Sequence, residues 1–475
     1  MTLVIASVHA CMPEQLDGAD LLEIRIDGMT LDEVTNQLPE LLKLSPLPTV
    51  VTCRSVAEGG MFEGEEDERV AMYRVALHCE TPPRYIDIEH ETLSHHPLLL
   101  DALASEHTDV ILSWHDINGR PKDLLKRASE MQSVAGVSIV KMVWRARSLR
   151  DNLEAFSLLQ TRQQPMIAMC MGEYGLMSRV LAPKFGAFAV YASVDGQEVT
   201  APGQPTTREL WSLYHFKEID SATKVYGVIG NNVAHSASPA FHNYAFKVAG
   251  KNAVYLPLPI PSGWEHLKAT VLELSHMTEL DFAGASVTIP HKENMYKLLN
   301  DADANCAVSG ATNTVSVCDR KLIGKNTDIQ ALEQLAPNAK RVAILGGGGV
   351  ARAAIVAMKN IGAEVFVATR KQDQAKKLAQ GLGCSQATND VAAIDTIINC
   401  TPAGMEGGDD EQGNPLVALL PEFQLCSSMT VIDTVYKPKE TPLIKQALDA
   451  GCTTINGDAM FRIQAVAQQQ IWLPT

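Results

Sequence analysis

The first half of the chain alternates eight short β-rich runs with polar segments of helical character, and this repeat constrains the fold more than any other feature. Segments such as Leu31–Leu44 and Asp151–Gln160 separate successive runs. Strands that alternate with helices form parallel sheets, and eight such units close into a (β/α)8 barrel of the TIM type. The runs are TLVIASV, LLEIRID, PTVVTCR, RYIDIE, DVILSWH, SIVKMVW, MIAMCM and AFAVYAS.

Ionisable residues fall in the C-terminal parts of these runs, which form the catalytic rim of a barrel. Each has a plainer interpretation when taken singly, because a strand-end lysine is usually solvated, a histidine before aspartate often lies in a turn, and Glu–Arg pairs are often structural. Together on one rim they would be costly to bury without a function, so we predict an active site there. The residues are Glu23, Arg25, Arg54, Glu89, His115 and Lys141.

The chemistry of these side chains favours an imine mechanism. Lys141 could attack a ketone and form a Schiff base, which withdraws electrons while an adjacent proton leaves. His115 could move that proton, since the usual pKa of histidine lies near neutrality. Glu89 ends the preceding run, and we expect it to orient His115. Three arginines offer paired donors to a carboxylate: Arg25, Arg54 and Arg179.

A glycine-rich loop in the second half predicts a dinucleotide site. The string RVAILGGGGVARAAI places this loop between a strand-like run and a helix, whose N-terminus favours a pyrophosphate. The next run, EVFVATRKQ, ends in Thr369, Arg370 and Lys371 rather than in an acid. Cations there suit the 2′-phosphate of NADP, although a solvated basic turn is the plainer alternative.

Polar residues between the two regions are candidates for a second substrate site. Lys292, in SVTIPHK, and Asp328, in GKNTD, could form a proton-transfer dyad. Serine and asparagine often serve only as caps or turn residues, so each is ambiguous alone. The other candidates are Ser236, Ser238, Thr288 and Asn313.

The strand pattern breaks after Ser193, and a new α/β pattern opens at KVYGVIG. We therefore expect a barrel over residues 1–219 and a second, two-lobed α/β unit over 220–475. Within that unit, residues 220–336 and a C-terminal helix would form one lobe. Residues 337–455 would form a Rossmann lobe for NADP.

Composition excludes several classes of partner. The 475 residues carry a net charge of −15, which disfavours nucleic acids and anionic membranes. The sequence shows neither an apolar span of about 18 residues nor a signal-peptide pattern at its start, so we expect a cytoplasmic protein. Its 10 scattered cysteines predict reduced thiols and no metal site.

Residues 3–215 resemble the type I 3-dehydroquinate dehydratases through EIRID, TCRSVAEGG, DIE, SWHD, VKM, MGEYGLMSRV and APGQ. The resemblance implies that Lys141 forms an imine with the ketone of 3-dehydroquinate. His115 would remove the carbon-2 proton and help expel water, and Arg179 would bind the carboxylate. Thr200 stands where the family usually has serine, and keeps the hydroxyl group. Residues implied to hold the ring and its hydroxyls are Glu23, Arg25, Arg54 and Gln204.

Residues 225–473 resemble the shikimate dehydrogenases, also through NCTPAGM, DTVYKPKETPL and RIQAVAQ. Ser286, Thr369, Gly347 and Val350 depart from the usual family residues. The implied substrate residues are Ser236, Ser238, Thr288, Lys292, Asn313, Asp328, Tyr436 and Gln464, joined by Gln468 one helical turn further on. The implied NADP residues are Gly346, Gly347, Gly348, Gly349, Val350, Ala351, Thr369, Arg370, Lys371, Thr401, Thr434 and Gly457.

The two resemblances explain each other, because the product of the first reaction, 3-dehydroshikimate, is the substrate of the second. The whole chain therefore resembles a bifunctional enzyme of the shikimate pathway, which makes aromatic amino acids by way of chorismate. Two alternatives stay open. One half could be inactive and serve as a docking or sensing module, or the second half could oxidise quinate.

Overall fold

The computed structural model describes residues 1–9, 11–13, 15–96, 99, 108–196, 203–388 and 393–473. The chain divides into two compact units, Met1–Val225 with Phe246–Pro259, and Tyr226–Ala245 with Ile260–Thr475. Both units combine parallel strands with helices, which confirms the predicted α/β class. The predicted boundary between residues 219 and 220 stays a prediction.

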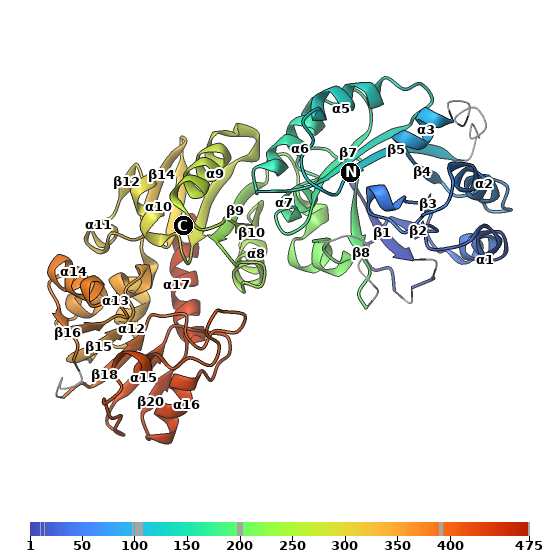
Figure 1. The fold of residues 1–475 in the computed structure, drawn as a ribbon. Coiled ribbons are helices and arrows are strands. Elements are labelled where there is room, and N and C mark those ends of the chain that lie inside the picture. Colours follow the sequence, from blue (N-terminus) through green and yellow to red (C-terminus); the bar gives the residue numbers. More distant parts are fainter. Residues whose placement is uncertain are drawn as a thin grey trace. The chain divides into compact units, whose positions relative to one another are not determined.

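The first unit contains an eight-stranded parallel sheet in the order β7-β6-β5-β4-β3-β2-β1-β8. The backbone N–H of Phe188 donates to the carbonyl of Met166 at 2.8 Å and links the two ends of this order. The sheet is thus the predicted barrel, nearly closed (Figure 1). Its strands are β1 Leu3–His9, β2 Leu21–Arg25, β3 Thr49–Thr52, β4 Tyr85–Glu89, β5 Asp109–Asp116, β6 Ile139–Arg145, β7 Met166–Met171 and β8 Ala189–Ser193.

Helices between the strands cover the outside of the barrel (Figure 1). Helix α1, Leu31–Leu44, has the predicted bounds. Thr30 and Glu33 cap its N-terminus reciprocally, and Val34, Leu38 and Leu42 bury one face at a spacing of one turn. The others are η1 Val56–Glu58, α2 Glu66–Leu77, α3 His90–His95, α5 Leu124–Gln132, α6 Asp151–Gln160, α7 Leu176–Val180, η2 Glu209–Leu213 and η3 Phe216–Glu218.

A mixed six-stranded sheet has the order β10-β9-β11-β13-β14-β12. Strands β13 and β14 form a hairpin whose two-residue turn, Asp319–Arg320, has positive φ at both positions, as a type I′ turn requires. The elements of this part are β9 Lys224–Gly230, α8 Ser238–Val248, β10 Ala253–Pro259, α9 Trp264–His276, η4 Thr278–Leu280, β11 Phe282–Val287, α10 Lys292–Leu298, β12 Asp301–Ala302, α11 Ala304–Ser309, β13 Thr314–Cys318, β14 Lys321–Lys325 and α12 Thr327–Leu335.

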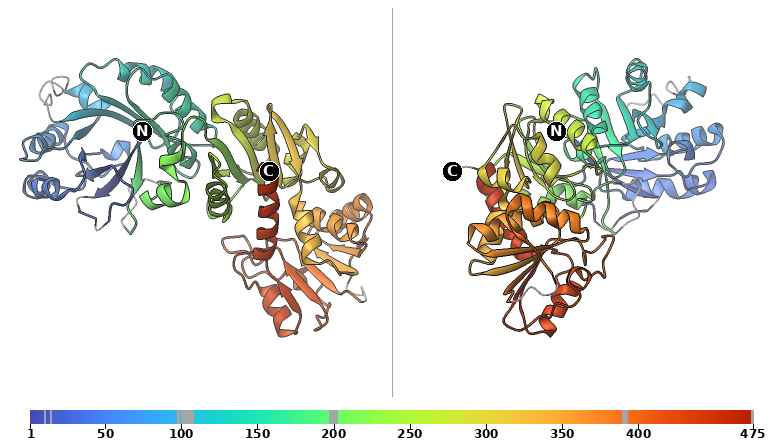
Figure 2. Two further views of the ribbon diagram at one scale, coloured as in Figure 1. Left: turned by 180° about the vertical axis from the view of Figure 1, so that it is seen from behind. Right: turned by 60° about the vertical axis from the view of Figure 1, so that its left-hand side comes forward.

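A parallel six-stranded sheet follows, in the order β17-β16-β15-β18-β19-β20. Counted from β15, this is the strand order 3-2-1-4-5-6 of dinucleotide-binding folds, so the predicted Rossmann lobe is confirmed. Figure 2 shows α17, in red, running between this parallel sheet and the mixed sheet. The elements are β15 Arg341–Leu345, α13 Gly349–Asn360, β16 Glu364–Ala368, α14 Gln372–Leu382, β17 Ser385–Gln386, β18 Thr396–Asn399, α15 Pro415–Leu419, β19 Thr430–Asp433, α16 Pro442–Asp449, β20 Thr453–Ile455 and α17 Gly457–Trp472.

Candidate active sites

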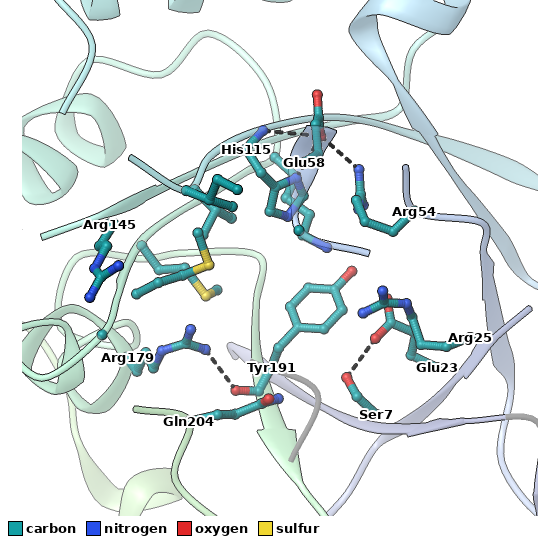
Figure 3. A pocket seen from close by; sticks show the side chains of 17 residues that line it. Ser7, Glu23, Arg25, Arg54, Glu58, His115, Arg145, Arg179, Tyr191 and Gln204 are labelled. Atoms are coloured by element: carbon teal, nitrogen blue, oxygen red, sulfur yellow. Dashed lines mark hydrogen bonds and ion pairs between the residues drawn. The ribbon is translucent and has the colours of Figure 1, made fainter. Parts of the chain in front are cut away.

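A pocket of about 280 Å³ opens inside the barrel (Figure 3). Its walls combine guanidinium and carboxylate groups with the side chains of Met169 and Met171, so the pocket suits a small, polar, anionic ring. Seven residues predicted from the sequence line it: Glu23, Arg25, Arg54, His115, Lys141, Arg179 and Gln204.

Lys141 lies deeper than predicted, because it is the third residue of β6 rather than a strand-end residue. It is 4% exposed, and its Nζ donates to Asp87 Oδ2 at 2.8 Å. The same nitrogen lies 3.7 Å from the ring centroid of Tyr191. Burial lowers the pKa of Lys141, although Asp87 and Glu23 oppose that shift. The amine is therefore more nucleophilic at neutral pH than a solvated lysine.

Asp87 allows Lys141 to be buried, because its negative charge balances the positive charges of Lys141 and Arg54. Arg54 donates to Asp87 Oδ1 at 2.6 Å, and the Ser113 hydroxyl donates to the same oxygen at 2.5 Å. Burial acts to raise the pKa of Asp87, but Arg54 and Lys141 together hold it below its usual value. Asp87 therefore stays ionised beside Lys141, a contact that the sequence analysis missed.

His115 is held by Glu58, not by Glu89 as predicted. Glu58 Oε2 lies 2.9 Å from His115 Nδ1 and accepts the His115 backbone N–H at 3.1 Å. Glu58 lies in η1, just after β3, and Arg54 donates to it at 2.9 Å. A Cβ on Gly60 would lie 2.1 Å from the carbonyl oxygen of Arg54, so only glycine permits this turn. The string EGG in the sequence was the available signal.

Glu89 stabilises the loop that carries Glu58. Its Oε1 accepts the backbone N–H of Ser55 at 2.8 Å, and its Oε2 accepts from Arg69 at 2.6 Å. Glu89 contacts this loop because it ends β4, beside the start of the loop that follows β3. Its carboxylate is therefore occupied by that loop rather than by the imidazole.

Two arginines of the pocket have different partners. Arg25 donates through Nε and Nη2 to both oxygens of Asp27, each at 2.7 Å. Among the residues that the structure describes, Arg179 donates only to the backbone carbonyls of Cys170 and Tyr191, each at 3.2 Å. Burial lowers the pKa of Arg179 to about 10. A buried guanidinium with carbonyl partners alone is suited to receive a carboxylate ligand.

The remaining pocket residues are positioned by the backbone and by strand neighbours. Glu23 accepts hydrogen bonds from Ser7 at 2.6 Å and Thr52 at 2.7 Å. Gly203 has φ +73°, and a Cβ there would lie 2.4 Å from the carbonyl oxygen of Gly172. That close approach carries the next residue, Gln204, into the pocket wall. Thr200 lies outside the residues that the structure describes.

In the second unit, the predicted dyad is in contact. Lys292 Nζ donates to Asp328 Oδ2 at 2.5 Å, with both side chains at most a tenth exposed. Asn313 Nδ2 donates to Asp328 Oδ1 at 2.8 Å and to Gln464 Oε1 at 3.3 Å. Lys292 lies in α10, Asp328 in α12 and Gln464 in α17, and Asn313 precedes β13. The fold therefore brings together four predicted residues that are distant in the sequence.

The other predicted substrate residues surround this group less directly. Gln468 donates to the Asn313 carbonyl at 3.2 Å and accepts from the Ser286 hydroxyl at 2.8 Å. Gln468 thus supports the Asn313 backbone. The Tyr436 ring stacks on Phe461, one turn before Gln464. Thr288 is half-buried at the turn before Lys292, and the Ser236 hydroxyl accepts the backbone N–H of Ser238 at 3.2 Å.

The glycine loop joins β15 to α13. Gly346 has φ +119°, and its Cβ would lie 3.1 Å from Thr401 Cγ2. A Cβ on Gly347 would lie 3.0 Å from Thr369 Cγ2, whereas one on Gly348 would meet open space. Gly348 forms the N-cap of α13 without a side-chain hydrogen bond. The first backbone N–H groups of α13 are therefore available to a phosphate.

Further predicted cofactor residues differ in position. Arg370 and Lys371 are exposed at the end of β16, and the Thr369 hydroxyl donates to the Lys371 carbonyl at 2.7 Å. A Cβ on Gly457 would lie 2.6 Å from the Thr434 carbonyl oxygen. Two residues pack in the core instead: Val350 partly, and Ala351 with its side chain fully buried. Ala351 can reach a ligand only through its backbone.

Among the residues that the structure describes, no three His, Cys, Asp or Glu side chains are grouped so that they could hold a metal ion. Within the same residues, each helix is too short or too polar to cross a membrane.

Comparisons with known proteins cover both units. The family profile described as type I 3-dehydroquinase matches residues 6–221, and that of the shikimate dehydrogenase substrate binding domain matches residues 228–315. The bifunctional 3-dehydroquinate dehydratase/shikimate dehydrogenase of Arabidopsis thaliana, described as chloroplastic, is 35% identical over 96% of this chain and 78% of its own length.

Two further proteins match the second half. The shikimate dehydrogenase (NADP(+)) of Methanopyrus kandleri is 34% identical over 54% of this chain and 91% of its own length. The solved shikimate 5-dehydrogenase of Thermus thermophilus, in complex with NADP(H) and shikimate, is 26% identical, with a TM-score of 0.47. The match covers 53% of this chain and 94% of the solved one.

Proposed function

Because the chain belongs to the family of bifunctional 3-dehydroquinate dehydratase/shikimate dehydrogenases, we propose that it performs two consecutive reactions at two separate sites. It is an enzyme with a lyase and an oxidoreductase activity. The barrel dehydrates 3-dehydroquinate to 3-dehydroshikimate, and the second unit reduces this product to shikimate with NADPH. A cytoplasmic location stays a prediction.

The dehydration starts at Lys141, and its position between Asp87 and Tyr191 is the observation that carries the proposal. The neutral amine attacks carbon 3 of 3-dehydroquinate, and the ketone oxygen leaves as water to give an iminium. His115 takes the proton from carbon 2, and the electron pair of that C–H bond moves toward the iminium nitrogen. The enamine electrons then return to form the double bond between carbons 1 and 2, the carbon-1 hydroxyl takes the proton from His115 and leaves as water, and the iminium re-forms. Hydrolysis of the iminium frees Lys141 and the product.

The charges of the pocket support this order of events. Asp87 stays ionised beside the nitrogen of Lys141, so a positive iminium there keeps its counter-ion. Burial, followed by the charges of Arg54 and Lys141, lowers the pKa of His115, which therefore enters the reaction as a neutral base. Arg179 would bind the substrate carboxylate, because its guanidinium contacts backbone carbonyls and no carboxylate among the described residues.

The residues around the glycine loop fit NADP. The loop offers backbone N–H groups at the start of α13, and Arg370 and Lys371 place two exposed cations at the end of β16. The relative from Methanopyrus kandleri is named for the same cofactor. When bound, NADPH supplies the hydride for the reduction. Lys292, held by Asp328 at 2.5 Å, donates a proton to the ketone oxygen as that oxygen becomes a hydroxyl.

A single incubation tests the pair of reactions. The purified chain is given 3-dehydroquinate and NADPH, and we expect shikimate to form as NADPH is consumed in equal amount. Accumulation of 3-dehydroshikimate without NADPH oxidation would mean that the second half is inactive. The formation of neither 3-dehydroshikimate nor shikimate would mean that the barrel is inactive. Borohydride added with 3-dehydroquinate should attach the ligand to the peptide that holds Lys141, and a label elsewhere contradicts the imine step.

A further inference from the structure

Tyr191 is a buried phenol whose hydroxyl oxygen has no hydrogen-bond partner among the residues that the structure describes. It is 5% exposed, it belongs to β8, and it lines the barrel pocket. A buried tyrosine hydroxyl usually has a partner, because leaving it without one costs free energy. An unsatisfied hydroxyl in the wall of a ligand pocket therefore indicates that the ligand supplies the partner.

The direction of the Tyr191 side chain indicates which part of the ligand its hydroxyl contacts. In Figure 3 the hydroxyl end of Tyr191 points toward the side of the pocket where Arg25 and Arg54 lie, and away from Arg179. If Arg179 binds the carboxylate, the hydroxyl of Tyr191 meets the opposite end of the substrate ring. Burial, followed by the nearby charges of Asp87 and Glu23, raises the pKa of Tyr191, so the phenol keeps its proton and can donate it.

The ring of Tyr191 has a second relationship, with Lys141. The Nζ of Lys141 lies 3.7 Å from the ring centroid, within the range in which an aromatic face attracts a cation. In the imine this nitrogen is bonded to carbon 3 of the substrate and carries the positive charge. Carbon 2 must then face His115, so carbon 4 and its hydroxyl lie on the other side of the imine carbon.

We propose that Tyr191 is a catalytic residue of the barrel reaction, whose ring stabilises the iminium formed on Lys141 and whose hydroxyl donates to the carbon-4 hydroxyl of the substrate. This inference rests on the proposed imine mechanism. The ring and the hydroxyl of Tyr191 would thus have two roles that can be tested separately. The ring acts on the charge that persists from imine formation to hydrolysis, and the hydroxyl group selects ligands that carry an oxygen next to the ketone carbon.

Tyr191→Phe tests the hydroxyl, because it keeps the ring. On 3-dehydroquinate we expect kcat/KM to fall about three- to tenfold, the effect of one hydrogen bond. An analogue without the carbon-4 hydroxyl should be dehydrated by wild type and Tyr191→Phe at the same rate, because the bond is already absent. An equal loss on both substrates overturns the assignment of the hydroxyl.

Tyr191→Leu tests the ring, with Tyr191→Phe as its matched control. We expect kcat to fall by a further tenfold or so on both substrates. The ring favours the ammonium form of Lys141, so its loss should lower the pKa of Lys141, measured from the pH dependence of Lys141 acetylation by acetic anhydride. A pKa that does not fall in Tyr191→Leu, or that falls equally in Tyr191→Phe, overturns the assignment of the ring.

Two controls separate this inference from its premises. Shikimate oxidation by the same variants, together with their thermal unfolding, reports whether the protein is folded. Borohydride trapping of 3-dehydroquinate by the wild type reports whether an imine forms on Lys141 at all. Failure of trapping in the wild type rejects the proposed mechanism, whereas normal trapping with unchanged kinetics in both Tyr191 variants rejects only the role of Tyr191.

Discussion

One carboxylate oxygen, Oε2 of Glu58, contacts His115 twice, at the ring nitrogen Nδ1 at 2.9 Å and at the backbone N–H at 3.1 Å. Two contacts to one residue fix both the position of its backbone and the orientation of its ring. When Glu58 is ionised, Nδ1 carries the proton and donates it to Oε2. Nε2 is then the basic nitrogen, as proton removal from the substrate requires.

The protonation of Glu58 should therefore control dehydration. Burial raises the pKa of Glu58 to about 8, against the opposing effect of Arg54. Below this pH the carboxyl is protonated and Nδ1 loses its acceptor, so we expect kcat to rise with pH to a plateau above about pH 8. Glu58→Gln should lower kcat by about a hundredfold or more and remove this rise. The measurement is kcat for dehydration from acid to alkaline pH, with the exposed Glu91→Gln as the control.

Glu89→Gln should behave differently, because Glu89 holds the Ser55 N–H and Arg69 rather than the imidazole. Removing this buried charge leaves Arg69 without one of its carboxylate partners, so the free energy of unfolding should fall by about 3 kcal/mol. Urea denaturation measures that loss. The rise of kcat should remain in the folded variant but move to lower pH, because the charge of Glu89 helps to raise the pKa of Glu58. Its disappearance in Glu89→Gln, with an intact rise in Glu58→Gln, would restore Glu89 as the partner of His115.

The sequence predicted the barrel well because its strands are short, apolar and separated by polar helices. All eight predicted runs overlap a strand of the barrel. It also predicted the lysine, the histidine and three of the four arginines that line the pocket, but it missed Arg145. The partner of His115 was wrong, because Glu58 lies in a short turn that has no periodic pattern, whereas Glu89 ends a strand. Tyr191 was missed because an aromatic residue in a strand is usually core, and only the structure shows that it lines the pocket and that its buried hydroxyl has no hydrogen-bond partner among the described residues.

The two activities should be lost separately, because the two lysines are held by carboxylates of their own units. Lys141→Ala should abolish dehydration and spare shikimate oxidation, and Lys292→Ala or Asp328→Asn should do the reverse. Steady-state assays of both reactions on each variant provide the measurement. Loss of both activities in a folded variant would contradict independent sites.

The glycine loop should also control the position of Lys292. A Cβ on Gly349 would lie 2.6 Å from Lys292 Cβ, so Gly349→Ala must displace one of the two backbones. A displacement of about 1 Å near reacting groups can cost about a hundredfold in rate, so we expect shikimate oxidation to fall tenfold to a hundredfold. The matched control is Gly381→Ala in α14, whose Cβ meets nothing within 4 Å. Equal rates in the two variants would show that Lys292 tolerates the shift.

Cofactor choice should depend on Arg370. Strand β16 ends without an acid and continues into Thr369, Arg370 and Lys371, where an acidic residue would repel a 2′-phosphate. An exposed guanidinium can instead donate two hydrogen bonds to that phosphate. A charge-assisted contact of this kind contributes about 1.5–3 kcal/mol, or roughly tenfold to a hundredfold in affinity. We expect the wild type to prefer NADP and Arg370→Ala to raise KM for NADP while hardly changing KM for NAD.

Lys377→Ala, which removes an exposed charge from the middle of α14, should leave the preference unchanged. Equal use of NAD by the wild type, or an unchanged ratio of the KM values for NADP and NAD in Arg370→Ala, would show that Arg370 does not bind the 2′-phosphate.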